Sequence, residues 1–176
     1  MSAVTLELTR KMNVACRALE LDTAIEQLQE EHLFLKDKLL NFYSQTQMIG
    51  ADQTVHNWMD KLRDLKMQVL HFRKQLNKHA AWEEKDVFPC VAMYTGREMG
   101  VLAVMEQEHE LAEQYIQAYL QSMDRAVAPI DYQEAKNMAS YLLQAYLILV
   151  DHFRKEEEYI FPLAEQMLTE AERFFL

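Results

Sequence analysis

The sequence contains few of the residues that interrupt regular structure. Only three glycines and three prolines occur in 176 residues, while 50% of the residues are hydrophobic. The many turns of a β-sandwich or β-barrel require more turn-forming residues than this. The composition therefore favours an all-α fold. A chain of this length fits a single domain over residues 1–176, with enough residues to bury a sizeable core.

Other kinds of residue are scarce as well, and this disfavours several classes of protein. The two cysteines, Cys16 and Cys90, do not make a disulfide framework. No stretch approaches the roughly 18–20 apolar residues that span a bilayer, and the N-terminus lacks the continuous apolar segment of a secretory signal. Eighteen basic against twenty-eight acidic residues give a formal charge of −10, which argues against nucleic acid and anionic membranes as partners. We expect a cytoplasmic protein.

What the sequence does contain is a motif that occurs twice. His79 and His152 each begin the pattern His-x-x-x-Glu-Glu-x-x-x-Phe-Pro. Residues four apart on a helix lie on the same face, so each histidine projects together with the glutamate that follows it, Glu83 or Glu156. A single His-x-x-x-Glu spacing is common by chance, but two copies of the whole pattern are not.

A second signature precedes each copy of this motif. Glu31-His32 comes before the first copy and Glu108-His109 before the second, so the chain consists of two similar halves. Imidazole and carboxylate ligands without a thiolate suit iron, manganese or zinc better than calcium or magnesium. The pattern predicts a dinuclear metal centre inside a helical bundle. The predicted ligands are His32 and His79 for one metal, His109 and His152 for the other, and Glu83 and Glu156 as bridges.

The alternative is that these side chains are buried without a metal, in mutual hydrogen bonds. Each buried charge or polar group would then need its own compensating partner, which makes this alternative costly. The two histidines outside the pattern, His56 and His71, are expected to be surface or ordinary core residues. His71 precedes His79 by eight residues, or about 12 Å along a helix, which is too far for a shared coordination sphere.

The glutamates that adjoin the predicted ligands are open to two interpretations. Glu84 and Glu157 follow the predicted bridges and point about 100° away from them on a helix, toward solvent or toward the surroundings of the metals. Glu31 and Glu108 precede the single histidines in both halves. Their repetition suggests a role beside the metals, whereas exposed charge is the commoner explanation for a glutamate on a helix.

The apolar periodicity and the breaks in it predict an up-down-up-down antiparallel four-helix bundle over residues 22–167. Residues 1–20 are predicted as an N-terminal arm and residues 163–176 as a short C-terminal helix. The first bundle helix is expected to begin near residue 22, where Thr23 and Glu26 have capping-box spacing, and the second near residue 54. Asp131 is expected to cap the fourth helix. Pro89 is expected to end or kink the second helix, and the fourth helix is expected to end near Phe161-Pro162.

The doubled His … His-x-x-x-Glu pattern is similar to that of the hemerythrin-like, histidine-histidine-glutamate cation-binding domain, and the similarity covers residues 25–167. This resemblance implies a bundle that holds two iron ions, bridged by oxygen or by carboxylates, with manganese or zinc as substitutes. Oxygen carriers of the family have a His-x-x-x-His spacing on the third helix, where this chain has His109 followed by Glu113. Glu113 is therefore an additional candidate ligand.

The resemblance also implies what such a centre does. We expect a protein that binds or senses a diatomic ligand, oxygen or nitric oxide, or that senses or stores iron. The alternative is a di-iron enzyme, or a stress protein that repairs iron centres and acts on nitric oxide or peroxide. The repair proteins carry an additional cysteine-bearing N-terminal domain, and residues 1–20 do not resemble it. A homo-oligomer is compatible with the sequence.

Overall fold

The computed structural model describes residues 3–49, 51–95 and 100–175. Within these ranges the chain forms helices and connections and contains no strand, so the predicted all-α fold is confirmed. None of the described helices combines the length and the apolar character needed to cross a membrane. The elements in order are α1 (Ala3–Met48), α2 (Met59–Trp82), η1 (Glu83–Val87), α3 (Phe88–Thr95), α4 (Gly100–Arg125), α5 (Tyr132–Lys155), η2 (Glu156–Ile160) and α6 (Phe161–Phe175).

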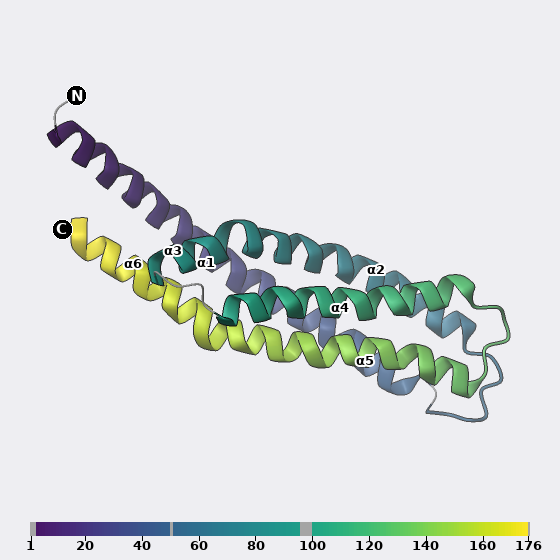
Figure 1. The fold of residues 1–176 in the computed structure, drawn as a ribbon. Coiled ribbons are helices and arrows are strands. Elements are labelled where there is room, and N and C mark those ends of the chain that lie inside the picture. Colours follow the sequence, from purple (N-terminus) through teal and green to yellow (C-terminus); the bar gives the residue numbers. More distant parts are fainter. Residues whose placement is uncertain (1–2, 50, 96–99, 176) are drawn as a thin grey trace.

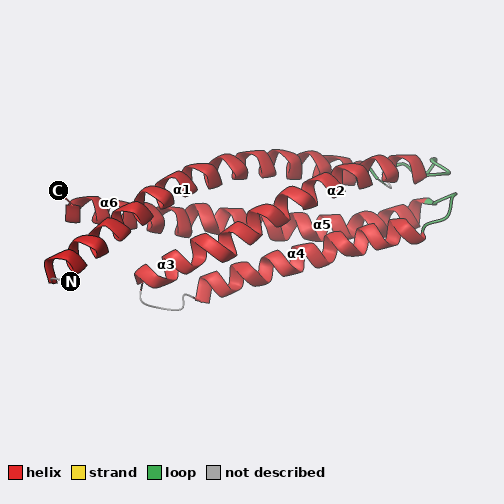
Figure 2. Cartoon of the chain, turned by 90° about the horizontal axis from the view of Figure 1, so that it is seen from above, coloured by secondary structure: helices red, strands yellow, loops and turns green. Residues whose placement is uncertain are grey.

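Four long helices form a closed ring, in which α1 and α4 each pack against both α2 and α5. Figure 1 shows α1 and α4 running in one direction and α2 and α5 returning. The α1–α2 and α4–α5 connections lie at the same end of the bundle (Figure 2). There the Asn57 side-chain oxygen accepts hydrogen bonds of 3.1 Å from the backbone N–H groups of Met59 and Ile130. One side chain thus ties the two connections together.

The predicted start of the first bundle helix is wrong. Helix α1 is continuous from Ala3, so Thr23 lies in its interior, and residues 3–20 belong to this helix instead of forming a separate arm. No glycine or proline occurs before Gly50, and a capping-box spacing does not start a helix where the preceding residues already continue one. Figure 1 shows the N-terminal part of α1 extending beyond the ring of four helices.

The second helix begins at Met59 and not near residue 54. The Asp52 carboxylate accepts hydrogen bonds from the backbone N–H of Thr54 at 2.8 Å and from its hydroxyl at 2.7 Å. Such local side-chain bonds hold the backbone in a turn and compete with helix formation. The predicted cap of the fourth helix is confirmed, because the Asp131 carboxylate accepts a hydrogen bond of 2.8 Å from the N–H of Glu134.

Pro89 and Pro162 do not end helices. Each follows a π-helical turn, η1 or η2, that joins two α-helices without a break. In η1 the N–H of Phe88 donates to the carbonyl of Glu83, five residues back, and η2 has the equivalent bond. Proline lacks an N–H, and its ring clashes with the carbonyl four residues before it. A wider turn relieves this conflict, so a π-turn that begins at the glutamate of each His-x-x-x-Glu precedes the repeated Phe-Pro. The predicted C-terminal helix is α6, and Leu176 lies outside the described residues.

The interior of the bundle is mainly apolar. One apolar cluster fills the half nearest the two connections, and a second fills the half nearest α3 and α6. The buried imidazoles and carboxylates of the described residues all lie between these clusters, and they are the residues that the sequence predicted as metal ligands. They are His32, His79, Glu83, His109, His152 and Glu156.

Candidate metal centre

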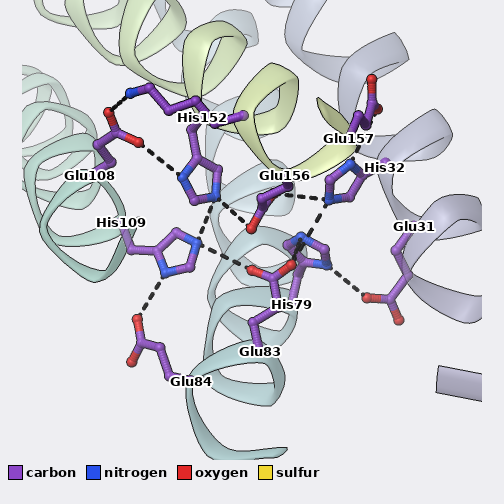
Figure 3. Close-up of polar contacts among 11 residues, drawn as sticks. Glu31, His32, His79, Glu83, Glu84, Glu108, His109, His152, Glu156 and Glu157 are labelled. Carbon is purple, nitrogen blue, oxygen red and sulfur yellow. Dashed lines mark hydrogen bonds and ion pairs between the residues drawn. The ribbon is translucent and has the colours of Figure 1, made fainter. Parts of the chain in front are cut away.

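Each long helix of the ring contributes one histidine to this polar layer. The two glutamates are the first residues of η1 and η2, one turn after a histidine on α2 or α5. Figure 3 shows the six side chains converging from four directions. The histidines are His32 on α1, His79 on α2, His109 on α4 and His152 on α5.

The six side chains form two groups that share both glutamates. His32 and His79 belong to one group and His109 and His152 to the other. Within each group one nitrogen or oxygen atom from every residue lies within 4.8 Å of the others. The structure therefore brings all six residues together. The two histidines of the first half of the chain lie in one group and the two of the second half in the other, as the sequence predicts.

Each shared carboxylate turns one oxygen toward each pair of histidines. Glu83 Oε1 lies 3.2 Å from Nε2 of His79, while its Oε2 lies 3.3 Å from Nε2 of His109. Glu156 repeats this arrangement, with Oε2 lying 3.1 Å from Nε2 of His32 and Oε1 lying 3.3 Å from Nε2 of His152. A carboxylate that offers its two oxygens to two separate nitrogen pairs is arranged as a bridge.

Several atoms at the centre are buried without a hydrogen-bond partner. They are Nε2 of His32 and of His79, Oε2 of Glu83 and both carboxylate oxygens of Glu156. Their mutual distances are those of ion pairs, but the angles are not those of hydrogen bonds. An unsatisfied buried polar atom costs about 1–3 kcal/mol, and cations bound among these atoms would satisfy them. The donor set therefore fits metal ions that take nitrogen and carboxylate ligands.

The other ring nitrogen, Nδ1, of each histidine faces a further glutamate, which we call an outer glutamate. An Nδ1–H group that donates to a carboxylate leaves Nε2 as the free lone pair and fixes the orientation of the ring. The outer glutamates thus direct all four Nε2 atoms toward the centre. The distances to Nδ1 are 3.3 Å for Glu157 and His32, 3.1 Å for Glu31 and His79, 2.8 Å for Glu84 and His109, and 3.4 Å for Glu108 and His152.

For Glu31 and Glu108, the commoner interpretation as exposed helix charge is wrong. Both side chains are partly buried against a histidine of the next helix along the chain. Their repetition beside His32 and His109 was the only signal in the sequence that pointed to this role. Glu84 contacts Nδ1 of His109 while its side chain stays 41% exposed, so it faces both this histidine and solvent.

Glu113 lies outside both groups. Its carboxylate accepts hydrogen bonds of 2.8 and 3.1 Å from Nε of Arg73, and a further one from the same guanidinium. The structure therefore places Glu113 in an ion pair with Arg73 and not with the six residues of the centre. His56 and His71 are exposed, in agreement with their exclusion from the predicted site.

Burial and charge act in opposite directions on the groups of the centre. Burial lowers the pKa of His32, but the carboxylates of Glu156 and Glu83 outweigh it and raise this pKa to about 9. Burial likewise opposes the charge of His152, yet Glu156 and Glu108 raise its pKa to about 10. Burial raises the pKa of Glu83, whereas the surrounding histidines lower it well below its usual range. In the metal-free protein, protons on imidazoles compensate the buried carboxylates.

Comparison with known proteins agrees with this geometry. Residues 23–164 match the protein family described as the hemerythrin HHE cation binding domain. No curated protein and no solved structure matches the chain at a significant level. The matched range spans most of the chain and includes all six residues of the centre. The chain therefore belongs to the hemerythrin HHE cation-binding family.

Proposed function

We propose that this protein holds a dinuclear iron centre. His32 and His79 bind one ion, His109 and His152 bind the other, and Glu83 and Glu156 bridge them. The observation that carries this proposal is that both buried carboxylates direct one oxygen to each histidine pair. Iron, manganese and zinc all accept such ligands, and membership of the family favours iron.

We propose further that the centre binds or senses a diatomic molecule, oxygen or nitric oxide, or senses iron itself. Bound iron supplies redox chemistry and affinity for such ligands. The protein supplies an apolar enclosure: the His32 ring packs against Phe153 and Phe161 at centroid distances of 4.8 and 4.9 Å. On the other side Phe88 lies parallel to His109. Apolar rings beside a metal limit the access of water and tune its chemistry.

A di-iron enzyme or repair protein that acts on nitric oxide or peroxide is the second candidate. It requires a route by which substrate reaches the metals, and one observation favours it. A groove between α2 and α4 extends to His109. The same groove also admits a ligand to a binding protein, so steady-state turnover decides between the two candidates.

The test is metal analysis and visible spectroscopy of protein purified without oxygen, followed by exposure to oxygen and to nitric oxide. We expect two metal ions per chain, mainly iron, and a spectral change that saturates at a stoichiometric amount of ligand. Continuous consumption of peroxide or nitric oxide would instead favour the enzyme. One metal per chain, or none, in fully loaded protein would overturn the dinuclear centre.

A further inference from the structure

The two halves of the proposed centre are not equally accessible. His109 is 7% exposed, whereas each of the other five proposed ligands is 0 or 1% exposed. His109 forms part of the wall of the groove between α2 and α4, which has a volume of about 430 Å³. One water occupies about 30 Å³ in the liquid, so a divalent cation with its hydration shell fits this groove.

The groove carries negative charge along its length. Four glutamates line it, and one of them, Glu113, is neutralised by Arg73. Among the residues that the structure describes, the other three, Glu84, Glu106 and Glu110, form no ion pair with a lysine or arginine. A groove lined by carboxylates concentrates cations and repels anions. Oxygen-rich surroundings of this kind suit a hydrated divalent cation.

Glu84, at the inner end of the groove, differs from the other outer glutamates. Glu157 binds Lys36 at 2.9 Å, Glu108 binds Lys155, and Glu31 lies 3.6 Å from Lys78. Within the described part of the chain, Glu84 has no such cation and is the most exposed of the four. Figure 3 shows it on the outer side of His109. Since the ring of His109 is its one anchor among the residues that the structure describes, its carboxylate can meet a cation in the groove.

We infer that divalent cations enter and leave the centre through the groove between α2 and α4. Glu84 transfers the cation between the groove and His109, and the ion held by His109 and His152 exchanges faster than the ion held by His32 and His79. This inference rests on the proposed dinuclear centre and specifies the route and the order by which it is loaded.

A second groove provides a matched control. It lies between α1 and α2, has a volume of about 240 Å³ and is lined by residues that include Glu30, Gln75, Lys78 and Glu31, the outer glutamate of His79. None of its lining residues is a proposed ligand. A bulky or charged substitution here alters a groove that shares α2 with the proposed route but none of the residues that line that route.

The experiment measures loading and release of Fe²⁺ in the absence of oxygen. Protein loaded to two ions per chain is mixed with a chromogenic iron chelator, and we expect one ion per chain to leave in a fast phase and one in a slow phase. Ala81→Trp, on the exposed rim of the α2–α4 groove, should slow the fast phase. Gln75→Trp, in the control groove, should leave the fast phase unchanged, because this groove adjoins only the pair of His32 and His79.

A second pair of variants tests charge in place of size. Glu110→Lys introduces a cation on the proposed route and should slow Fe²⁺ uptake about tenfold at low salt, an effect that salt screens. Glu30→Lys is the control in the other groove and should not slow uptake. Both glutamates are exposed, so neither change disturbs the core.

The outcomes separate the route from the centre. Equal rates for Ala81→Trp, Glu110→Lys and the unmodified protein, all holding two ions per chain, would overturn the route and leave the centre standing. A single release phase that Ala81→Trp slows would support the route and overturn the unequal exchange. Fewer than two ions per chain in the unmodified protein would overturn the centre, and the inference with it.

Discussion

The carboxylate of Glu31 lies 3.1 Å from Nδ1 of His79, although 48 positions separate the two residues in the sequence. Glu108 stands in the same relation to His152, at 3.4 Å. Each of these glutamates directly precedes a histidine in the sequence, His32 or His109, but its carboxylate contacts a different histidine on the next long helix. The orientation of one predicted ligand thus depends on how two helices pack together.

This relation predicts that Glu31→Ala and Glu108→Ala weaken iron binding although neither residue is a proposed ligand. Loss of a carboxylate that orients a ligating histidine typically lowers metal affinity about 10–100-fold. Glu31→Gln should recover part of the loss, because its amide oxygen still accepts a hydrogen bond from Nδ1–H. Competition with a chelator of known affinity measures the effect. If Glu31→Ala matched a control change at the exposed Glu26, the outer glutamate would have no such role.

The choice of histidines is tested by removing them one at a time. His79→Ala and His152→Ala should sharply lower the iron content of the purified protein, because each removes a buried nitrogen from one of the two groups. His56→Ala and His71→Ala should not, since both histidines are exposed. Iron per chain is measured after identical reconstitution of all four variants. Equal losses throughout would show that the wrong histidines had been selected.

Glu113→Ala should leave the iron content unchanged. Its carboxylate pairs with Arg73 at the surface of the groove and belongs to neither ligand group. A partly exposed ion pair of this kind contributes about 1 kcal/mol or less to the free energy of unfolding, so the variant should also fold normally. Iron analysis and denaturant titration check both expectations. Loss of one ion per chain would make Glu113 a ligand after all.

Removal of the metal should lower the melting temperature. Ions that bind the folded chain and not the unfolded chain stabilise it, by about 2.7 kcal/mol when their free concentration is 100 times the dissociation constant. Calorimetry of metal-free and reconstituted protein measures the difference. In His79→Ala the same comparison should give a smaller shift. Identical melting temperatures for the unmodified protein with and without iron would contradict a centre that links the four helices.

Metal loading should release protons. In the metal-free protein the carboxylates raise the pKa of His32 to about 9 and that of His152 to about 10, so both imidazoles are protonated at pH 7. A metal displaces these protons, and its apparent affinity therefore rises with pH. Without metal, the protonated imidazoles stabilise the fold below about pH 6.5, their unfolded pKa, and this contribution is lost as the pH rises through the folded values.

Calorimetric titrations in two buffers with different ionisation enthalpies count the released protons. The heat of metal binding should differ between the buffers in proportion to that number. Equal heats in both buffers would show that the imidazoles are already neutral at pH 7.

The sequence was sufficient for those features that depend on local spacing. A histidine and a glutamate four residues apart share a helix face wherever the helix lies, so His79 and Glu83 could be paired without a structure. The apolar stripe around His32 likewise identified it as buried, and it is 1% exposed. Because the same motif occurs again at His152 and Glu156, the second half of the centre could be predicted in the same way.

Features that depend on contacts between elements could not be predicted in the same way. A glutamate that supports a histidine and one that faces solvent look the same in sequence, and only the rotation of α1 against α2 distinguishes them. The start of α1 was misplaced because a capping spacing at Thr23 carries no information about whether earlier residues are helical. The ion pair of Glu113 required knowledge that Arg73 of α2 faces α4 at this level.

The π-turns allow a residue five positions after each glutamate to share its face of the helix. Phe88 lies five residues after Glu83, a position about 140° away from it on a regular α-helix, yet its ring is parallel to that of His109 at 6.3 Å. The extra residue in the turn brings it back to the centre. Deletion of one residue from η1 would leave the phenylalanine four positions after Glu83, about 40° from it on a regular α-helix, so an ordinary helical turn would keep this ring near His109. Insertion of one residue into an ordinary helical turn and its accommodation as a π-turn would therefore leave the face of α3 that meets His109 unchanged.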